Sequence, residues 1–69
     1  MKISARNVLP GRITAIVPGP VTTQVTLEVA PGVEVVSTIT SESAKSLGLQ
    51  VGGRAYGVIK ASSVMIATD

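Results

Sequence analysis

The 69-residue sequence contains neither cysteine nor histidine. The chain can therefore form no disulfide and no thiolate metal site, and it lacks the side chain that most often serves as metal ligand or general base. No serine and lysine are placed so that one would order the other as nucleophile and base. We expect a binding or structural protein rather than an enzyme, with no cofactor and no metal-cation site. The absence of cysteine also fits the reducing cytoplasm, which is the expected location.

Aromatic residues, strong charge and long apolar runs are equally scarce. Tyr56 is the only aromatic residue and the net charge is +2, whereas modules that bind single-stranded nucleic acid use stacked aromatics and basic grooves. No stretch approaches the roughly 20 apolar residues of a membrane span. Arg6, Asn7 and Pro10 interrupt the N-terminal segment where the apolar part of a signal peptide would lie. We therefore expect no nucleic-acid partner, no membrane partner and no secretion signal.

The length of the chain predicts a small domain that needs additional stabilisation. We expect one domain over residues 1–69. The core of so small a domain contributes little net stability, and disulfides are excluded. Oligomerisation or a bound ligand remains as the source of further stability.

The residues that are abundant favour strands. Val, Ile and Thr dominate, and β-branched side chains pack well on a pleated sheet. The clearest alternation is in residues 21–30, where one face carries Val21, Thr23, Val25, Leu27 and Val29. Residues 2–8 resemble an extended arm, and the proline–glycine pairs near residues 10, 19 and 31 predict breaks or turns. We expect five strands, at residues 12–17, 21–30, 33–40, 54–61 and 63–68.

Between the third and fourth expected strands, the pattern changes to that of a short helix. Thr40 or Ser41 can cap its N-terminus, Glu42 complements the helix dipole in the first turn, and Gly48 suits the position after the last turn. Three strands, a short helix and two strands are the order of an OB-like five-stranded Greek-key barrel. We expect this all-β fold.

Three clusters of hydrogen-bond donors suggest a site for a small anion. A tetrahedral oxyanion in its dianionic form offers acceptors only, so its binding requires cations together with hydroxyl and N–H donors. One cluster lies in the N-terminal arm, a second follows the fourth expected strand, and a third lies at the start of the helix. Their members are Ser4, Arg6 and Asn7, then Lys60, Ala61 and Ser62, then Thr40 and Ser43.

These clusters lie within longer stretches that resemble a known family. "ISARN", "TSESAKSLGLQVGG" and "VIKASSVMIA" are similar to the molybdenum-pterin-binding (Mop) family, the small molbindins, whose module is also called TOBE. The resemblance covers nearly the whole chain. It implies an OB-like barrel, a hexamer built as a trimer of dimers, and molybdate or tungstate bound between subunits. The implied role is intracellular molybdenum storage, buffering or homeostasis.

The resemblance also implies which residues bind the anion. One subunit would contribute Ser4, Arg6 and Asn7, and the facing subunit would contribute Thr40, Ser43, Lys60, Ser62 and the backbone N–H of Ala61. A second class of site near the threefold axis would use main-chain donors of Gly19, Val21 and Thr22, although Pro18 and Pro20 in that segment lack N–H groups. Two alternatives stay open, an OB-type nucleic-acid-binding module and a purely structural assembly domain.

Overall fold

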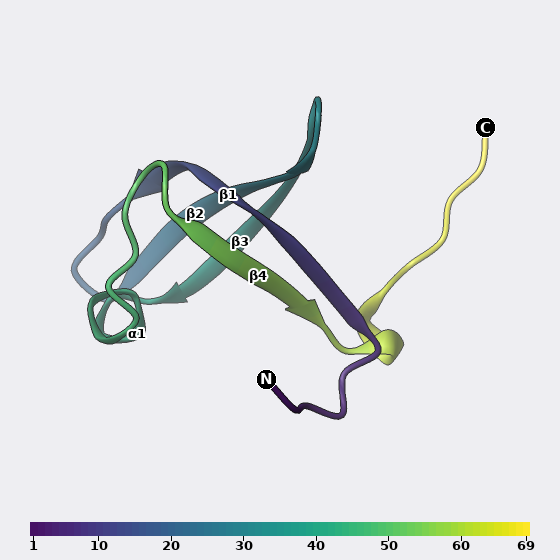
Figure 1. Cartoon of the computed structure of the whole chain (residues 1–69), viewed down its shortest axis with the longest axis horizontal. Helices are drawn as coiled ribbons and strands as arrows, with labels where there is room; N and C mark the ends of the chain where they lie inside the picture. Colours follow the sequence, from purple (N-terminus) through teal and green to yellow (C-terminus); the bar gives the residue numbers. More distant parts are fainter.

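A computed structural model describes residues 1–69 and shows an all-β chain with one short helix (Figure 1). A turn of 3-10 helix, η1, follows the last strand, and no helix in the chain has the length and apolar character needed to cross a membrane. The elements in chain order are β1 (Asn7–Val17), β2 (Thr22–Ala30), β3 (Val33–Thr40), α1 (Ser41–Ser46), β4 (Arg54–Ile59) and η1 (Ala61–Ser63).

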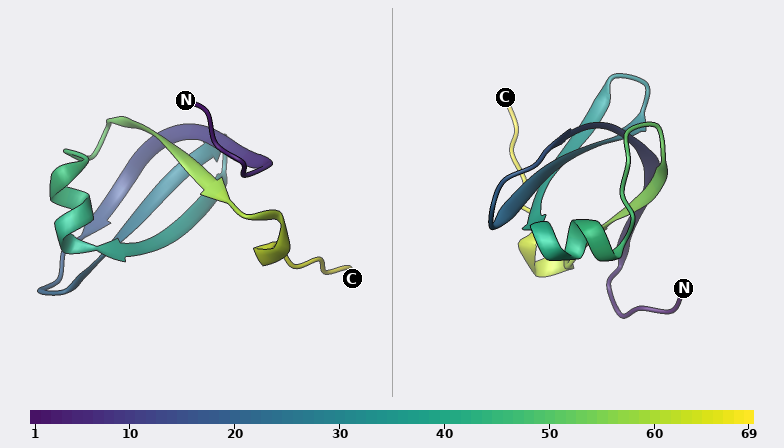
Figure 2. Two further views of the ribbon diagram at one scale, coloured as in Figure 1. Left: turned by 90° about the horizontal axis from the view of Figure 1, so that it is seen from below. Right: turned by 90° about the vertical axis from the view of Figure 1, so that its left-hand side faces the viewer.

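The four strands form one curled antiparallel sheet in the order β3-β2-β1-β4 (Figure 2). The long strand β1 pairs with β4 along residues 7–12 and with β2 along residues 12–17, so only Arg12 faces both neighbours. This stagger curls the sheet, because a sheet closes toward a barrel only when its strands are offset along one another.

The core lies on the concave face and is small. Ile13, Val25 and Leu27 are buried, with Ile16, Val29, Ile39, Leu49 and Ala55 packed around them. Buried Thr23, Val25 and Leu27 confirm the alternation expected for residues 21–30, whereas Val21 lies before β2 and is 72% exposed. Only four of the 69 residues are buried, so the single chain covers little apolar surface.

The expected break at Pro10-Gly11 is wrong, because β1 passes through both residues. Pro10 pairs with Tyr56 and Gly11 with Ala55 of β4. Over this half β1 has no β2 partner, and a proline is tolerated where one side of a strand makes no ladder bonds. Gly11 is required for another reason, since a Cβ there would lie 2.5 Å from the Glu28 carbonyl oxygen of β2.

The expected fifth strand is also absent, so the sheet is an open half-barrel of four strands. β4 ends at Ile59, and η1 then directs residues 64–69 away from the sheet (Figure 1). Val64, Met65 and Ile66 are 45%, 92% and 87% exposed. A β-rich sequence becomes a strand only beside another strand edge, and within one chain this segment meets none.

The helix begins and ends where the sequence predicts. Thr40 is the N-cap, and its Oγ1 accepts a hydrogen bond from the Ser43 backbone N–H at 3.1 Å. Gly48 follows the helix with a φ of 63°, a conformation that favours glycine. α1 thus lies at the end of the sheet where β3 stops, opposite to the end where β4 stops (Figure 2).

Candidate functional site

The N-terminal arm and the segment after β4 come together at one end of the sheet. The β1–β4 ladder ends with the pair Asn7 and Ile59, so Arg6 and Lys60 leave the sheet side by side. An open hollow of about 660 Å³ lies between the two segments. It is lined by Ile3, Ser4, Ala5, Arg6, Val58, Lys60, Ala61 and Ser62.

The polar side chains that line this hollow are hydroxyls and cations. Arg6 and Lys60 supply two cations, Ser4 and Ser62 supply two hydroxyls, and no carboxylate lines the hollow. None of these four side chains makes a side-chain hydrogen bond within the chain. Ala61 and Ser62 are the first two residues of η1. The backbone N–H groups at the start of a helical turn have no acceptor within that turn, so these two N–H groups can donate to a ligand. Such a set fits an anion that offers only acceptors.

The expected site residues Ser4, Arg6, Lys60, Ala61 and Ser62 therefore lie together within a single chain. The family resemblance implies that they come from two subunits, yet the arm and η1 of one chain already share the hollow. All five residues are solvent-exposed, whereas their neighbours Ala5 and Ile59 are partly covered. An anion bound by this chain alone would keep much of its surface in water.

Asn7 lies at the base of the arm and does not line the hollow. Its Nδ2 donates a hydrogen bond to the Ile59 carbonyl oxygen at 3.3 Å. This bond connects the start of β1 to the end of β4, at the residues next to Arg6 and Lys60 in the sequence. In this chain Asn7 positions the two segments that form the hollow.

Thr40 ends β3 and Ser43 lies within α1, at the end of the sheet opposite to η1 (Figure 1). Thr40 pairs with Thr22, and its hydroxyl donates to Ser43 Oγ at 2.7 Å while it accepts from the Ser43 N–H. Both residues thus form the helix cap. Within one chain they cannot reach an anion that Arg6 and Lys60 bind.

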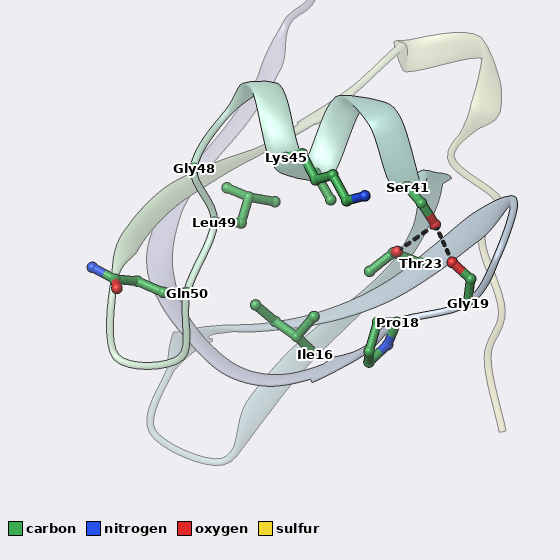
Figure 3. A pocket seen from close by; sticks show the side chains of 10 residues that line it. Ile16, Pro18, Gly19, Thr23, Ser41, Lys45, Gly48, Leu49 and Gln50 are labelled. Atoms are coloured by element: carbon green, nitrogen blue, oxygen red, sulfur yellow. Dashed lines mark hydrogen bonds between the residues drawn. The ribbon is translucent and has the colours of Figure 1, made fainter.

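A second hollow, of about 420 Å³, lies under α1 and is shown in Figure 3. Gly19 lines it, but Val21 and Thr22 do not. The sequence suggests Ser41 only as a possible helix cap, but its hydroxyl donates to the Gly19 carbonyl at 2.6 Å and lies 2.8 Å from Thr23 Oγ1. The Ser41 N–H also donates to the Val21 carbonyl at 2.8 Å. The main chain at residues 19 and 21 therefore serves as acceptor for Ser41, which anchors the loop before β2.

Comparisons with known proteins agree on one family. The family model described as TOBE domain matches residues 3–66. The chain is 42% identical over 69 residues to a probable molybdenum-pterin-binding protein of Haemophilus influenzae, with 100% of both proteins covered. It is 49% identical over 69 residues to the molybdenum transport protein ModE of Herbaspirillum seropedicae, of which it spans only 26%.

Three solved structures share the fold. MopII from Clostridium pasteurianum superposes with a TM-score of 0.91 at 39% identity, covering 97% of this chain and 100% of that one. A molybdate-binding protein from Sporomusa ovata gives 0.91 at 32% identity, covering 99% and 100%. The cytoplasmic molybdate-binding protein ModG, in a form with molybdate bound, gives 0.89 at 43% identity, covering 94% of this chain and 46% of that one.

Proposed function

Because this chain belongs to the TOBE domain family, we propose that it binds the molybdate oxyanion. The observation that carries the proposal is the hollow in which Arg6 and Lys60 meet the hydroxyls of Ser4 and Ser62 without any carboxylate. Relatives named molybdenum-pterin-binding protein and molybdate-binding protein support this ligand. Their names describe binding proteins and not enzymes.

The chemistry of the hollow matches the chemistry of the anion. Molybdate carries two negative charges, which the Arg6 guanidinium and the Lys60 ammonium offset. Its oxygens accept hydrogen bonds and donate none, so hydroxyl and backbone N–H groups complete the site without a conflict between donors. Tungstate has the same charge and nearly the same size, and binds in the same way.

A second copy of the chain completes the site. Only four residues are buried in the single chain, the apolar tail at residues 64–66 is exposed, and β3 and β4 are edge strands. A chain with these features gains stability by closing its edges against other copies. We favour a hexamer arranged as a trimer of dimers. Thr40 and Ser43 contribute to an anion near Lys60 only from another copy, because the two groups lie at opposite ends of one chain.

The biological role that follows is storage or buffering of molybdate in the cytoplasm. The structural relative ModG is described as a cytoplasmic molybdate-binding protein. The hollow that holds the anion is open, and the anion is released when the assembly dissociates. Both features are suitable for reversible storage. The main-chain site at Gly19, Val21 and Thr22 remains a secondary proposal, since Pro18 and Pro20 in the same segment offer no N–H group to an anion.

Titration calorimetry of the intact protein with molybdate tests the proposal. Saturable binding, accompanied by a rise in melting temperature, is expected. A ligand bound only by the folded protein adds about 2.7 kcal/mol of stability at a hundredfold excess over Kd. Absence of both heat and thermal stabilisation at millimolar molybdate would refute the function. In the same series, tight and salt-sensitive binding of a single-stranded DNA probe would favour a nucleic-acid module instead.

A further inference from the structure

Four charged side chains form one row across all four strands. The cross-strand partners are Glu34 with Glu28, Glu28 with Arg12, and Arg12 with Arg54. In the order of the sheet, β3-β2-β1-β4, the row reads Glu34, Glu28, Arg12, Arg54, and we call it the charge row. Residues directly opposite each other share a face of a sheet. Since the neighbouring Ile13 is only 1% exposed, on the concave face, the charge row lies on the outer face.

The order of charges in this row does not stabilise the sheet of the single chain. Like charges directly opposite each other destabilise a sheet, and the row contains two such pairs, Glu34 with Glu28 and Arg12 with Arg54. An alternating order of the same residues would give three attractive pairs. Within the chain, the only side-chain hydrogen bond that reaches the row is donated by Thr14 Oγ1 to Glu34 at 3.2 Å. The stability of the sheet therefore leaves the segregated order unexplained.

The segregated order is complementary to itself. A second copy can be generated by a rotation of 180° about an axis that is parallel to the strands and lies between the two outer faces. Across the contact, the charge row of this copy runs in the reverse order, with its two guanidiniums opposite the two carboxylates of the first copy. Three strand spacings of about 4.8 Å give the row a length of roughly 14 Å. Two copies that face each other in this way bring both carboxylates of each row opposite both guanidiniums of the other. A two-fold contact requires this kind of self-complementary surface.

We propose that the charge row is a docking surface for a second copy of this chain, with the two sheets packed outer face to outer face. The occupant is a second copy rather than an anionic polymer or an anionic lipid surface, because either of these would meet the carboxylates of Glu28 and Glu34. The proposal uses no part of the oxyanion hollow. Absence of molybdate binding by the wild-type protein would therefore not contradict it.

The surroundings of the charge row supply apolar area for such a contact. Tyr56 and Val36 lie two residues from Arg54 and Glu34 on their strands, hence on the same face, and are 58% and 59% exposed. A hollow of about 490 Å³ lies beside the row and is lined by Arg12, Glu28 and Arg54 together with the turn at Ala30 and Pro31. Charges of this kind set the register of a contact, while the apolar residues contribute buried area.

Charge reversal of each half of the row tests the proposal in the intact protein. The variants are Arg12→Glu/Arg54→Glu, whose row is wholly negative, and Glu28→Arg/Glu34→Arg, whose row is wholly positive. Sedimentation velocity should show that each variant alone loses one association step and that its dissociation constant rises at least tenfold. A one-to-one mixture of the two variants should regain the step. For the wild-type protein the step should weaken between about 0.05 M and about 0.5 M NaCl, as charges become screened.

The one-to-one mixture shows whether the reversed variants lose association because they are unfolded, since unfolded chains would not regain a defined complex. The control Lys2→Glu/Lys45→Glu changes the net charge as much as the first variant but lies outside the row, and should assemble like the wild-type protein. The milder variant Arg12→Gln/Arg54→Gln should abolish the salt dependence. Molybdate calorimetry on the same samples reports the oxyanion site separately. Unchanged association of both reversed variants, or a mixture that fails to regain the step although both variants are folded by circular dichroism, would overturn the proposal.

Discussion

The two ends of the curled sheet carry similar hydroxyl and cationic residues, but use them differently. At the end formed by the N-terminal arm and η1, the side chains of Ser4, Arg6, Lys60 and Ser62 make no side-chain hydrogen bond within the chain. At the helix end, the hydroxyls of Thr40 and Ser41 bond to other groups of the chain. The arm end thus brings two cations and two hydroxyls without partners to one hollow, whereas at the helix end Lys45 and the Ser43 hydroxyl hydrogen remain without a partner.

This difference shows how to distinguish a binding cluster from a structural one in so small a protein. Residue types alone do not separate the two ends, because both contain a lysine beside serines. The separation comes from where each donor finds its acceptor. Donors satisfied inside the chain stabilise the fold, whereas unsatisfied donors around a shared hollow are available to a ligand. Substitutions at the two ends should therefore affect different quantities.

The largest effect is expected from removal of both cations of the hollow. Each charge-assisted hydrogen bond contributes roughly 1.5–3 kcal/mol. Arg6→Ala/Lys60→Ala should therefore lower molybdate affinity at least about a hundredfold, the equivalent of about 2.7 kcal/mol. The matched control Lys2→Ala/Lys45→Ala removes the same charge outside the hollow and should change the affinity by less than about threefold, in line with weak long-range electrostatics. Equal losses in the two variants, measured by calorimetry, would mean that net charge and not the hollow binds the anion.

The next effect is selectivity between oxyanions, which depends on how rigidly the donors are held. Sulfate has the charge of molybdate but shorter bonds to oxygen, so donors that a contact between subunits holds in place cannot all reach it. Loss of two neutral hydrogen bonds at about 1 kcal/mol each gives roughly a thirtyfold preference for molybdate. Phosphate keeps a proton at neutral pH, and no carboxylate lines the hollow to accept it. Tungstate should match molybdate.

Competition at a single pH and ionic strength measures this order directly. If sulfate displaced molybdate at equal concentration, the hollow would be a general anion patch. The arm end would then differ from the helix end in exposure but not in specificity.

The parts of the molecule that depend on local chemistry could be predicted from the sequence. The cap at Thr40, the glycine after the helix at Gly48 and the alternation at Thr23, Val25 and Leu27 each follow from neighbouring residues, and all are confirmed. The arm and the segment at Lys60 were expected to share an anion site, and both line the same hollow.

The features that the sequence could not predict depend on distant partners. Pro10 and Gly11 predict a break, but at these residues β1 pairs with β4 and makes no ladder pair with β2, so the strand passes through them. Residues 63–68 have the composition of a strand, but a strand forms only beside the edge of another strand, and in the single chain this segment runs away from the sheet (Figure 1). Similarly, the separation of Thr40 from Lys60 results from the topology of the sheet and not from the chemistry of either residue.

Single serine substitutions should separate the two ends by readout. Ser62→Ala removes one neutral donor from the hollow, worth roughly 0.5–1.5 kcal/mol, and should lower molybdate affinity about fivefold without changing the free energy of unfolding. Ser41→Ala removes the hydroxyl that bonds to Gly19 and to Thr23, which is only 3% exposed. It should cost about 1–3 kcal/mol of unfolding free energy, because buried polar groups lose a partner. Denaturant titration without ligand, paired with calorimetry, gives both quantities. A stability loss for Ser62→Ala equal to that for Ser41→Ala would remove the distinction between the ends.

The smallest effect concerns Ser43, where the helix end can still contribute to binding through another copy. The Ser43 backbone N–H is capped by Thr40, and its hydroxyl oxygen accepts from the Thr40 hydroxyl, so its own hydroxyl hydrogen remains available. Ser43→Ala keeps the cap and should change the free energy of unfolding by less than about 0.5 kcal/mol. If the assembly brings this hydroxyl to an anion held by the Lys60 of another copy, molybdate affinity should fall about threefold, the lower range for one neutral hydrogen bond. Thr40→Ala is the matched comparison, since it removes the cap and should cost about 1 kcal/mol of stability. An unchanged affinity for Ser43→Ala would exclude this residue from the site and leave the arm and η1 as its only source of side-chain donors.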